Sequence, residues 1–183
     1  MDFTPTSIPD VILIQPRIFS DARGFFMETF SSKLFRQAGI PGPFVQDNHS
    51  GSHAATLRGL HYQIRQAQGK LVRAIRGEIF DVAVDLRRNS PTFGQWVGQI
   101  LSEDNKLQIW IPPGFAHGFY VLSEWAEVVY KVTDFYAPQW ERTLLWDDPD
   151  VAIQWPIPPG SSPTLSEKDA QGKRLKEAEL YDL

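Results

Sequence analysis

The strongest constraint on the fold is a series of nine short apolar segments of four to nine residues each, separated by turn-forming residues. They are rich in β-branched and aromatic side chains and too short for stable helices, so each predicts a β-strand. Many short strands with few helices are typical of an antiparallel sandwich or barrel, so the sequence predicts an all-β fold with a few short helices. The predicted strands are residues 11–19, 44–50, 56–63, 70–75, 79–86, 95–101, 107–111, 118–121 and 127–135.

Helical patterns occur in two places. Residues 31–38 begin at a capping serine and end at Gly39, and Ser166 to Asp169 has capping-box spacing with Asp in place of Glu. Two strand features add detail: residues 76–78 predict a tight hairpin, and residues 79–85, which lack strict alternation, predict a strand buried on both faces. No repeat or linker divides the chain, so residues 1–183 are expected to form one domain.

Composition excludes several functional classes. Lys and Arg total 18 against 22 Asp and Glu, and a net charge of −4 argues against nucleic acid or an anionic membrane as the main partner. The absence of cysteine excludes disulfides, thiolate zinc sites and a cysteine nucleophile. The N-terminus lacks a signal-peptide pattern, and the longest stretch without charge, residues 107–123, is interrupted by Pro and Gly. A cytoplasmic protein is therefore expected.

Two of the four histidines stand in informative contexts. The strand period places His61 on one face with Gly59 and Gln63, and residues 112–117 deliver His117 from a rigid Pro-Gly turn. Residues 112–117 have the Pro-x-Gly-x-x-His form of the second cupin motif and so resemble that β-barrel superfamily. Cupins often bind metal through a His-x-His pair, but Gln63 stands where the second histidine of the pair belongs. The remaining histidines predict a poor transition-metal site.

Each remaining candidate has an ordinary structural explanation when taken alone. Lys70 begins a predicted strand, where lysine is usually solvated, and Tyr130 lies among apolar neighbours that would suit a core tyrosine. Asp169 fits a helix cap. Surface salt bridges would account for Arg23, Arg58 and Lys168. None of these residues establishes a function by itself.

Seven blocks in a fixed order resemble the dTDP-4-dehydrorhamnose 3,5-epimerase family, and together they span nearly the whole chain. This resemblance implies a cupin-type jelly roll that works as a homodimer without metal or cofactor. The implied reaction epimerises carbons 3 and 5 of dTDP-4-dehydro-6-deoxy-D-glucose to give dTDP-4-dehydro-L-rhamnose in dTDP-L-rhamnose biosynthesis. The blocks are residues 21–28, 44–50, 57–63, 68–73, 113–119, 130–138 and 165–169.

The resemblance also implies four catalytic roles. His61 is the general base and Asp169 orients its imidazole, in competition with the capping role of Asp169. Tyr130 is the proton donor on the opposite face of the sugar, and Lys70 stabilises the enolate oxygen. Asp81 is a weaker candidate for a second anchoring carboxylate.

The nucleotide sugar needs a further set of contacts. The resemblance assigns Arg23, Glu28, Gln46, Asn48 and Arg58 to the deoxythymidine diphosphate, some of them expected from the partner subunit through strand exchange. Arginine suits a diphosphate because its planar fork bonds two oxygens at once. His117, Glu141 and Lys168 match further substrate-contacting positions.

Three alternatives remain at this point. Close relatives epimerise carbon 3 or carbon 5 only, although Tyr130 in its expected place favours the double reaction. A non-catalytic cupin that binds a sugar or nucleotide would not need His61, Tyr130 and Lys70 together. A metal-dependent cupin would hold a stoichiometric transition metal.

Overall fold

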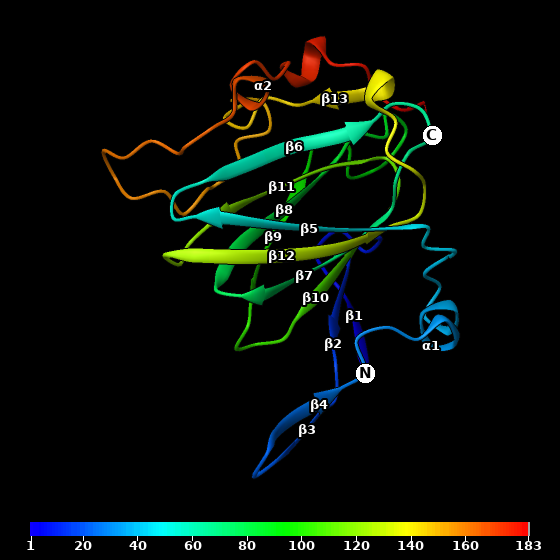
Figure 1. Cartoon of the computed structure of the whole chain (residues 1–183). Helices are drawn as coiled ribbons and strands as arrows, with labels where there is room; N and C mark the ends of the chain where they lie inside the picture. Colours follow the sequence, from blue (N-terminus) through cyan, green and yellow to red (C-terminus); the bar gives the residue numbers. More distant parts are fainter. Residues whose placement is uncertain (183) are drawn as a thin grey trace.

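Two antiparallel β-sheets face each other in the computed structural model, which describes residues 1–182 (Figure 1). The larger sheet has the strand order β1-β2-β10-β7-β12-β5, and the smaller has the order β13-β6-β11-β8-β9. The all-β sandwich predicted from the strand segments is therefore confirmed. The strands of the larger sheet are β1 (Asp2–Pro5), β2 (Ile12–Gln15), β10 (Gln108–Ile111), β7 (Lys70–Arg76), β12 (Trp125–Val132) and β5 (Gln46–His53). Those of the smaller sheet are β13 (Glu141–Thr143), β6 (Leu57–Gln63), β11 (Phe115–Val121), β8 (Glu78–Asp85) and β9 (Trp96–Ser102).

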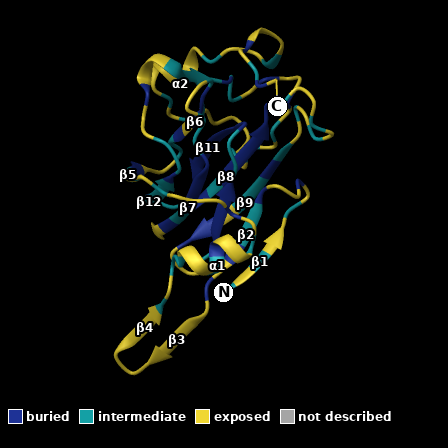
Figure 2. Ribbon diagram, turned by 90° about the vertical axis from the view of Figure 1, so that its right-hand side faces the viewer, coloured by how far each residue is buried: buried dark blue, intermediate teal, exposed yellow. Residues whose placement is uncertain are grey.

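A two-stranded hairpin projects from the lower end of the sandwich (Figure 1). It consists of β3 (Ile18–Asp21) and β4 (Gly24–Met27), which form a separate sheet. Figure 2 shows the hairpin almost wholly in the colour of exposed residues. Short helices complete the fold: α1 (Ser32–Gln37), α2 (Glu167–Ala170), η1 (Pro138–Trp140) and η2 (Leu175–Glu177).

Two predictions about the strands are wrong. Residues 11–19 form two strands rather than one, because the chain leaves β2 at Pro16 and re-enters extended structure in β3, which belongs to another sheet. The hairpin predicted at residues 76–78 does not form, because β7 pairs with β10 and β12 whereas β8 pairs with β9 and β11. The turn at Gly77 is a corner through which the chain passes from one sheet to the other.

The apolar core has two main layers. One lies between the sheets and includes Val72, Ala83 and Val128; the other covers the outer face of the five-stranded sheet and includes Val82 and Tyr181. Successive residues of β8 therefore enter different layers, as the prediction of a strand buried on both faces requires. The C-terminal segment contributes to the outer layer, so a cavity between the sheets lies beside the inner core layer.

The helix predicted at residues 31–38 is present as α1, although the Ser31 side chain makes no capping hydrogen bond. Within residues 1–182, no helix is long and apolar enough to cross a membrane.

Candidate active site

A cavity of about 360 Å³ opens between the two sheets, where polar side chains replace the apolar ones of the core. Its walls are the inward faces of β5, β7 and β12 from the larger sheet and of β6 and β11 from the smaller one. Nine of the predicted site residues line it: Gln46, Asn48, Arg58, His61, Lys70, His117, Tyr130, Glu141 and Lys168. The structure therefore brings most of the predicted site residues together in one cavity.

The position of His61 depends on a close approach between β6 and β11. A Cβ atom on Gly59 would lie 2.6 Å from Cα of Gly118, so the two backbones meet where both residues are glycine. Next to this contact, His61 is directly opposite His117 in the β-register. Both imidazoles therefore enter the cavity from the same wall, and His61 is the more exposed of the two.

Asp169 reaches His61 from the other end of the chain. Its Oδ1 lies 2.5 Å from Nε2 of His61, and the carboxylate is buried. The backbone N–H of Asp169 donates to Oγ of Ser166, so the serine caps α2 and leaves the Asp169 side chain free for the histidine. The predicted competition between the two roles is thus absent. Burial opposes ionisation, but hydrogen bonds from His61 and Ser166 hold the pKa of Asp169 below its ordinary value.

Lys70 is a buried cation at the start of β7. Its Nζ donates to the backbone carbonyl of His61 at 3.1 Å. Burial lowers the pKa of Lys70 to about 8, although Asp81 and Glu141 favour the charged form. The charged form of Lys70 therefore carries a desolvation penalty, and the hydrogen bond to His61 holds the ammonium group beside β6.

His117 and Asp81 form a second imidazole–carboxylate pair inside the sandwich. Nε2 of His117 lies 2.8 Å from Oδ2 of Asp81, and both side chains are buried. Burial lowers the pKa of His117 despite the nearby carboxylate, so its imidazole is neutral at pH 7. The other carboxylate oxygen of Asp81 is buried and has no hydrogen-bond partner in the structure.

Tyr130 enters the cavity from the wall opposite His61. It lies on β12 of the larger sheet, paired with Asn48 and Val72, whereas His61 lies on β6 of the smaller sheet. Burial raises the pKa of the Tyr130 phenol, which keeps it protonated at neutral pH. A ligand between the walls would meet an imidazole on one side and a phenol on the other.

Along β5, the side chains of Gln46, Asn48 and Ser50 line the cavity with polar groups. The Nε2 amide of Gln46 donates to Oδ1 of Asn48 at 2.8 Å, and the buried Ser50 hydroxyl has no hydrogen-bond partner among residues 1–182. Arg58 is held nearby by a hydrogen bond from Nε to Oγ of Ser52 at 2.8 Å. A guanidinium with amide and hydroxyl donors suits an anionic ligand.

The mouth of the cavity carries a chain of polar contacts that the sequence analysis only partly identified. Nζ of Lys168 donates to one carboxylate oxygen of Glu141 at 3.0 Å, and the Tyr136 hydroxyl donates to the other at 3.0 Å. Tyr136 was not predicted, and neither were the lining residues Ser50, Gln63 and Gln68. All four lie inside or beside the sequence blocks, but nothing local distinguishes them from ordinary strand or loop residues.

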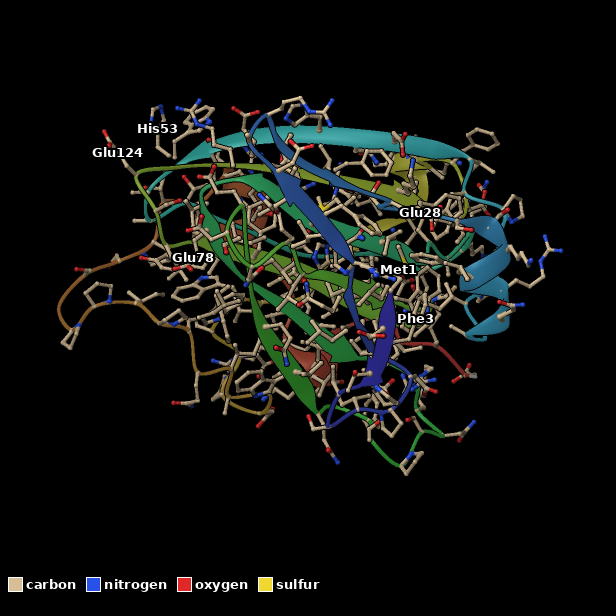
Figure 3. All side chains as sticks on the ribbon, turned by 90° about the horizontal axis from the view of Figure 1, so that it is seen from below. Met1, Phe3, Glu28, His53, Glu78 and Glu124 are labelled. Carbon is tan, nitrogen blue, oxygen red and sulfur yellow. The ribbon has the colours of Figure 1, made fainter. Side chains whose placement is uncertain are left out.

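The structure does not bring Arg23 and Glu28 to this cavity within one chain. Arg23 lies at the tip of the hairpin, largely exposed, and bonds to Asp21 through its guanidinium. Glu28 follows β4, on the chain between the hairpin and α1 (Figure 3).

Metal-ligating side chains are not clustered in the described part of the chain: residues 1–182 contain no group of three or more His, Cys, Asp or Glu suited to an ion. Both cavity histidines direct Nε2 to a carboxylate: His61 to Asp169 and His117 to Asp81. Gln63, at the position of the second cupin histidine, uses its side-chain amide to bond backbone groups.

Comparisons with known proteins give one family and one fold for this chain. The family model described as dTDP-4-dehydrorhamnose 3,5-epimerase matches residues 5–177. A Pseudomonas aeruginosa protein of that name is 62% identical over 182 residues, 99% of each chain. The structure of the Legionella pneumophila 3,5-epimerase in complex with dTDP-4-keto-L-rhamnose superposes with a TM-score of 0.92 at 53% identity, covering 96% of this chain and 93% of that one. A 3'-monoepimerase from Streptomyces bikiniensis, in complex with dTDP-quinovose, has a TM-score of 0.88 at 36% identity, covering 94% and 87%.

Proposed function

Since the chain belongs to the dTDP-4-dehydrorhamnose 3,5-epimerase family, a family of isomerases with a cupin-type fold, we propose that the cavity between its sheets is the active site. The activity of the chain is dTDP-4-dehydrorhamnose 3,5-epimerisation in dTDP-rhamnose biosynthesis. One observation carries the assignment of roles: the His61–Asp169 pair and the Tyr130 phenol face the same cavity from opposite walls. Inversion at a carbon requires a base and an acid on opposite faces of the substrate.

The first step is removal of a proton next to the ketone. Carbons 3 and 5 both flank the carbon-4 ketone of dTDP-4-dehydro-6-deoxy-D-glucose, so deprotonation of either gives an enolate. His61 takes the proton on the ring nitrogen that does not bond Asp169, and the buried carboxylate stabilises the imidazolium that forms. The C–H bond pair moves into the enolate, and its charge collects on the carbon-4 oxygen.

Lys70 stabilises that oxygen. Its ammonium is fixed beside the His61 strand in a desolvated position, where a charge interacts more strongly than it would in water. Neutral His117, anchored by Asp81, lies in the same wall and is placed to hydrogen-bond the sugar.

Tyr130 returns a proton to the carbon from the opposite wall. A phenol whose pKa is raised by burial holds its proton at neutral pH until the enolate carbon draws it away. The tyrosinate that forms recovers a proton from solvent through the cavity mouth, and the His61 imidazolium releases its proton to solvent, so that acid and base both return to their starting states. Repetition of the two transfers at the second carbon completes the reaction.

The nucleotide occupies the β5 side of the cavity in this proposal. Gln46, Asn48 and Arg58 bind the diphosphate, and Glu141 with Lys168 closes the mouth over the sugar. Support comes from the relative crystallised with a dTDP-sugar, which shares the fold over nearly its whole length.

The working unit is a homodimer in which the hairpin of each subunit completes the cavity of the other. Phe26 is 70% exposed, Phe25 57% and Phe19 51%, on a ribbon that shares no sheet with the rest of its own chain. An isolated two-stranded ribbon is marginal in water, and exposed aromatic clusters mark interfaces. Arg23 and Glu28 lie on or beside this ribbon, so exchange would bring them to the diphosphate of the partner site.

The decisive experiment follows deuterium by proton NMR. In deuterated water, the substrate should gain deuterium at both carbon 3 and carbon 5, and His61→Asn should abolish exchange at both. Tyr130→Phe should allow exchange while slowing inversion, because only the returning proton is lost. Exchange at a single carbon would identify a mono-epimerase, and unimpaired exchange in His61→Asn would overturn the assignment of the base. Stoichiometric metal by elemental analysis would overturn the metal-free mechanism.

A further inference from the structure

Gln63 uses every polar atom of its side chain on backbone groups. Its Nε2 donates to the carbonyls of Gln66 at 2.8 Å and Phe135 at 3.2 Å, and its Oε1 accepts from the N–H of Ala137 at 2.8 Å. The residue is only 4% exposed although it borders the cavity. With both amide hydrogens committed, Gln63 has no donor left for a substrate.

The three bonds join parts of the chain that carry different members of the proposed active site. Gln66 belongs to the turn that leads into Lys70 at the start of β7. Phe135 and Ala137 belong to the segment that leaves β12, the strand of Tyr130. Gln63 itself lies two residues from His61 on β6, so a single side chain links the carriers of the base, the cation and the acid.

The links cross from one wall of the cavity to the other. The segment after β12 is tied to its own sheet by Thr133, whose hydroxyl accepts from Gly69 N–H at 2.8 Å, and by Tyr136, whose N–H donates to Oε1 of Gln46. Phe135 and Ala137 bond instead to the β6 strand of the opposite sheet through Gln63. Tyr136 lies between these two anchor points and lines the cavity mouth.

The backbone of Gln63 is braced as well. It pairs with Glu141 in the register of β13, and its carbonyl accepts the Tyr181 hydroxyl at 2.5 Å in the buried C-terminal segment. Gln63 is therefore a fixed point against which residues 133–137 are held, since Glu141 and Tyr181 restrain its backbone.

We propose that Gln63 is a positioning residue that clamps the two cavity walls at their open end and thereby sets the separation between His61 and Tyr130. This inference rests on the roles proposed for His61 and Tyr130. It explains why an amide stands where the cupin motif has a second histidine: the position serves wall-to-wall alignment instead of ligation. A clamp of this kind matters for epimerisation, because base and acid must address the same carbon from opposite faces.

The test separates proton abstraction from inversion. Gln63→Glu keeps the shape of the side chain and the acceptor for Ala137 but replaces both N–H donors with an oxygen that faces two carbonyls. We expect kcat for inversion to fall about 100-fold, the scale of a displacement of about 1 Å. Deuterium exchange into recovered substrate should fall much less, because His61 stays on β6. The ratio of exchange to inversion should therefore rise by about tenfold or more.

Two further variants make the result decisive. Gln63→Met has similar volume and no charge, and it should give the same rise in the ratio if a buried carboxylate prevents the first variant from folding. Gln154→Glu changes the same atom at an exposed position and should leave both rates at the wild-type value. Circular dichroism and thermal denaturation establish that each variant is folded.

The proposal fails if a folded Gln63 variant inverts substrate within twofold of the wild-type rate, or if exchange and inversion fall by the same factor. Either outcome leaves the proposed function intact. That function fails independently if His61→Asn still exchanges, whatever the Gln63 variants do.

Discussion

Burial sets the protonation states of Lys70 and Tyr130. The Lys70 ammonium and the Tyr130 phenol lie in the same desolvated cavity, and burial disfavours the charged form of both. The pKa of the lysine falls to about 8, whereas that of the tyrosine rises, so at pH 7 the first is largely a cation and the second a neutral acid. One physical effect thus produces an oxyanion stabiliser and a proton donor from two ordinary residues.

Lys70 should impose an alkaline limit on catalysis. Above pH about 8 the charged fraction of Lys70 declines, so kcat should fall, approaching tenfold per pH unit. Tyr130 ionises at higher pH, because its pKa is raised, and does not account for this limit. Lys70→Met should lower kcat by about 10²- to 10³-fold and remove the decline. A rate for wild type that stays level from pH 7 to 10 would exclude Lys70 as the enolate-stabilising cation.

The same pKa makes a prediction about stability. In the unfolded chain Lys70 titrates near 10.5, so between pH 8 and 10.5 the unfolded state binds more protons than the folded one. The free energy of unfolding contributed by this group therefore rises with pH, by up to about 3 kcal/mol. Denaturant titrations of wild type and Lys70→Met at pH 7 and pH 10 check the sign: the difference between them should move in favour of wild type as the pH rises.

The placement of Asp169 depends on how α2 is held. A helix of four residues has no stability of its own. Backbone hydrogen bonds fix it on both sides, between Thr164 and Leu57 before the helix and between Lys173 and Leu145 after it. The chain passes closest to its neighbour at Gly172, where a Cβ atom would lie 2.7 Å from Cα of Leu145. These contacts place the Asp169 carboxylate on His61.

Gly172→Ala should therefore act on catalysis through Asp169. The added methyl group displaces the end of α2 and lengthens the hydrogen bond to His61, so kcat should fall by about 10-fold or more while KM changes little. Asp169→Asn should cost more, and the double variant should be no worse than Asp169→Asn alone, because both changes break the same contact. Additive losses in this cycle would mean that Gly172 affects activity by another route. Gly42→Ala, which meets no close contact, serves as the control.

Local sequence rules predict the elements better than their partners. Period-two alternation and turn residues located most strands within one to three residues, yet they assigned a hairpin at residues 76–78 that is a corner between sheets. The turn sequence is compatible with both outcomes. Pairing is decided by which strands compete for each edge, and that depends on residues far away in the chain. The short edge strands β1 and β13 were not predicted, because three or four residues carry too weak an alternation pattern to be recognised in isolation.

The hairpin of β3 and β4 pairs only with itself within the described chain, so it gains little support from the two main sheets. Its aromatic side chains are exposed, and its anchoring contacts include a cation–π interaction between Lys106 and the Phe25 ring at 4.3 Å. The predicted nucleotide ligand Arg23 is remote from the cavity that holds the other candidates. Insertion of the hairpin into a second copy of the chain would cover the exposed aromatic side chains of the hairpin. The same insertion would bring Arg23 to the cavity of that second copy.

The proposed exchange of hairpins between two subunits makes a complementation prediction. Arg23→Ala and His61→Asn should each form poorly active homodimers. When the two are mixed and allowed to exchange subunits, each heterodimer has one site with both residues intact, so activity should recover to about a quarter of the wild-type value. If each hairpin served the cavity of its own chain, mixing would restore nothing. Sedimentation of Phe26→Ser, which removes an exposed apolar anchor, should shift the protein toward monomer.

Alternation, turn residues and capping signals, which are properties of neighbouring residues, were enough to predict the fold class and a helix at residues 31–38, present as Ser32–Gln37. The ordered motifs indicated the family and, through that resemblance, nine of the residues that line the cavity. The contact between Asp169 and His61 was expected from the family resemblance, but three other features required the three-dimensional structure: Ser166 supplies the cap of α2, Asp81 bonds His117, and Gln63 bonds three backbone groups. Contacts of this kind depend on how two sheets pack and where the C-terminal segment crosses them, and no local pattern encodes that geometry.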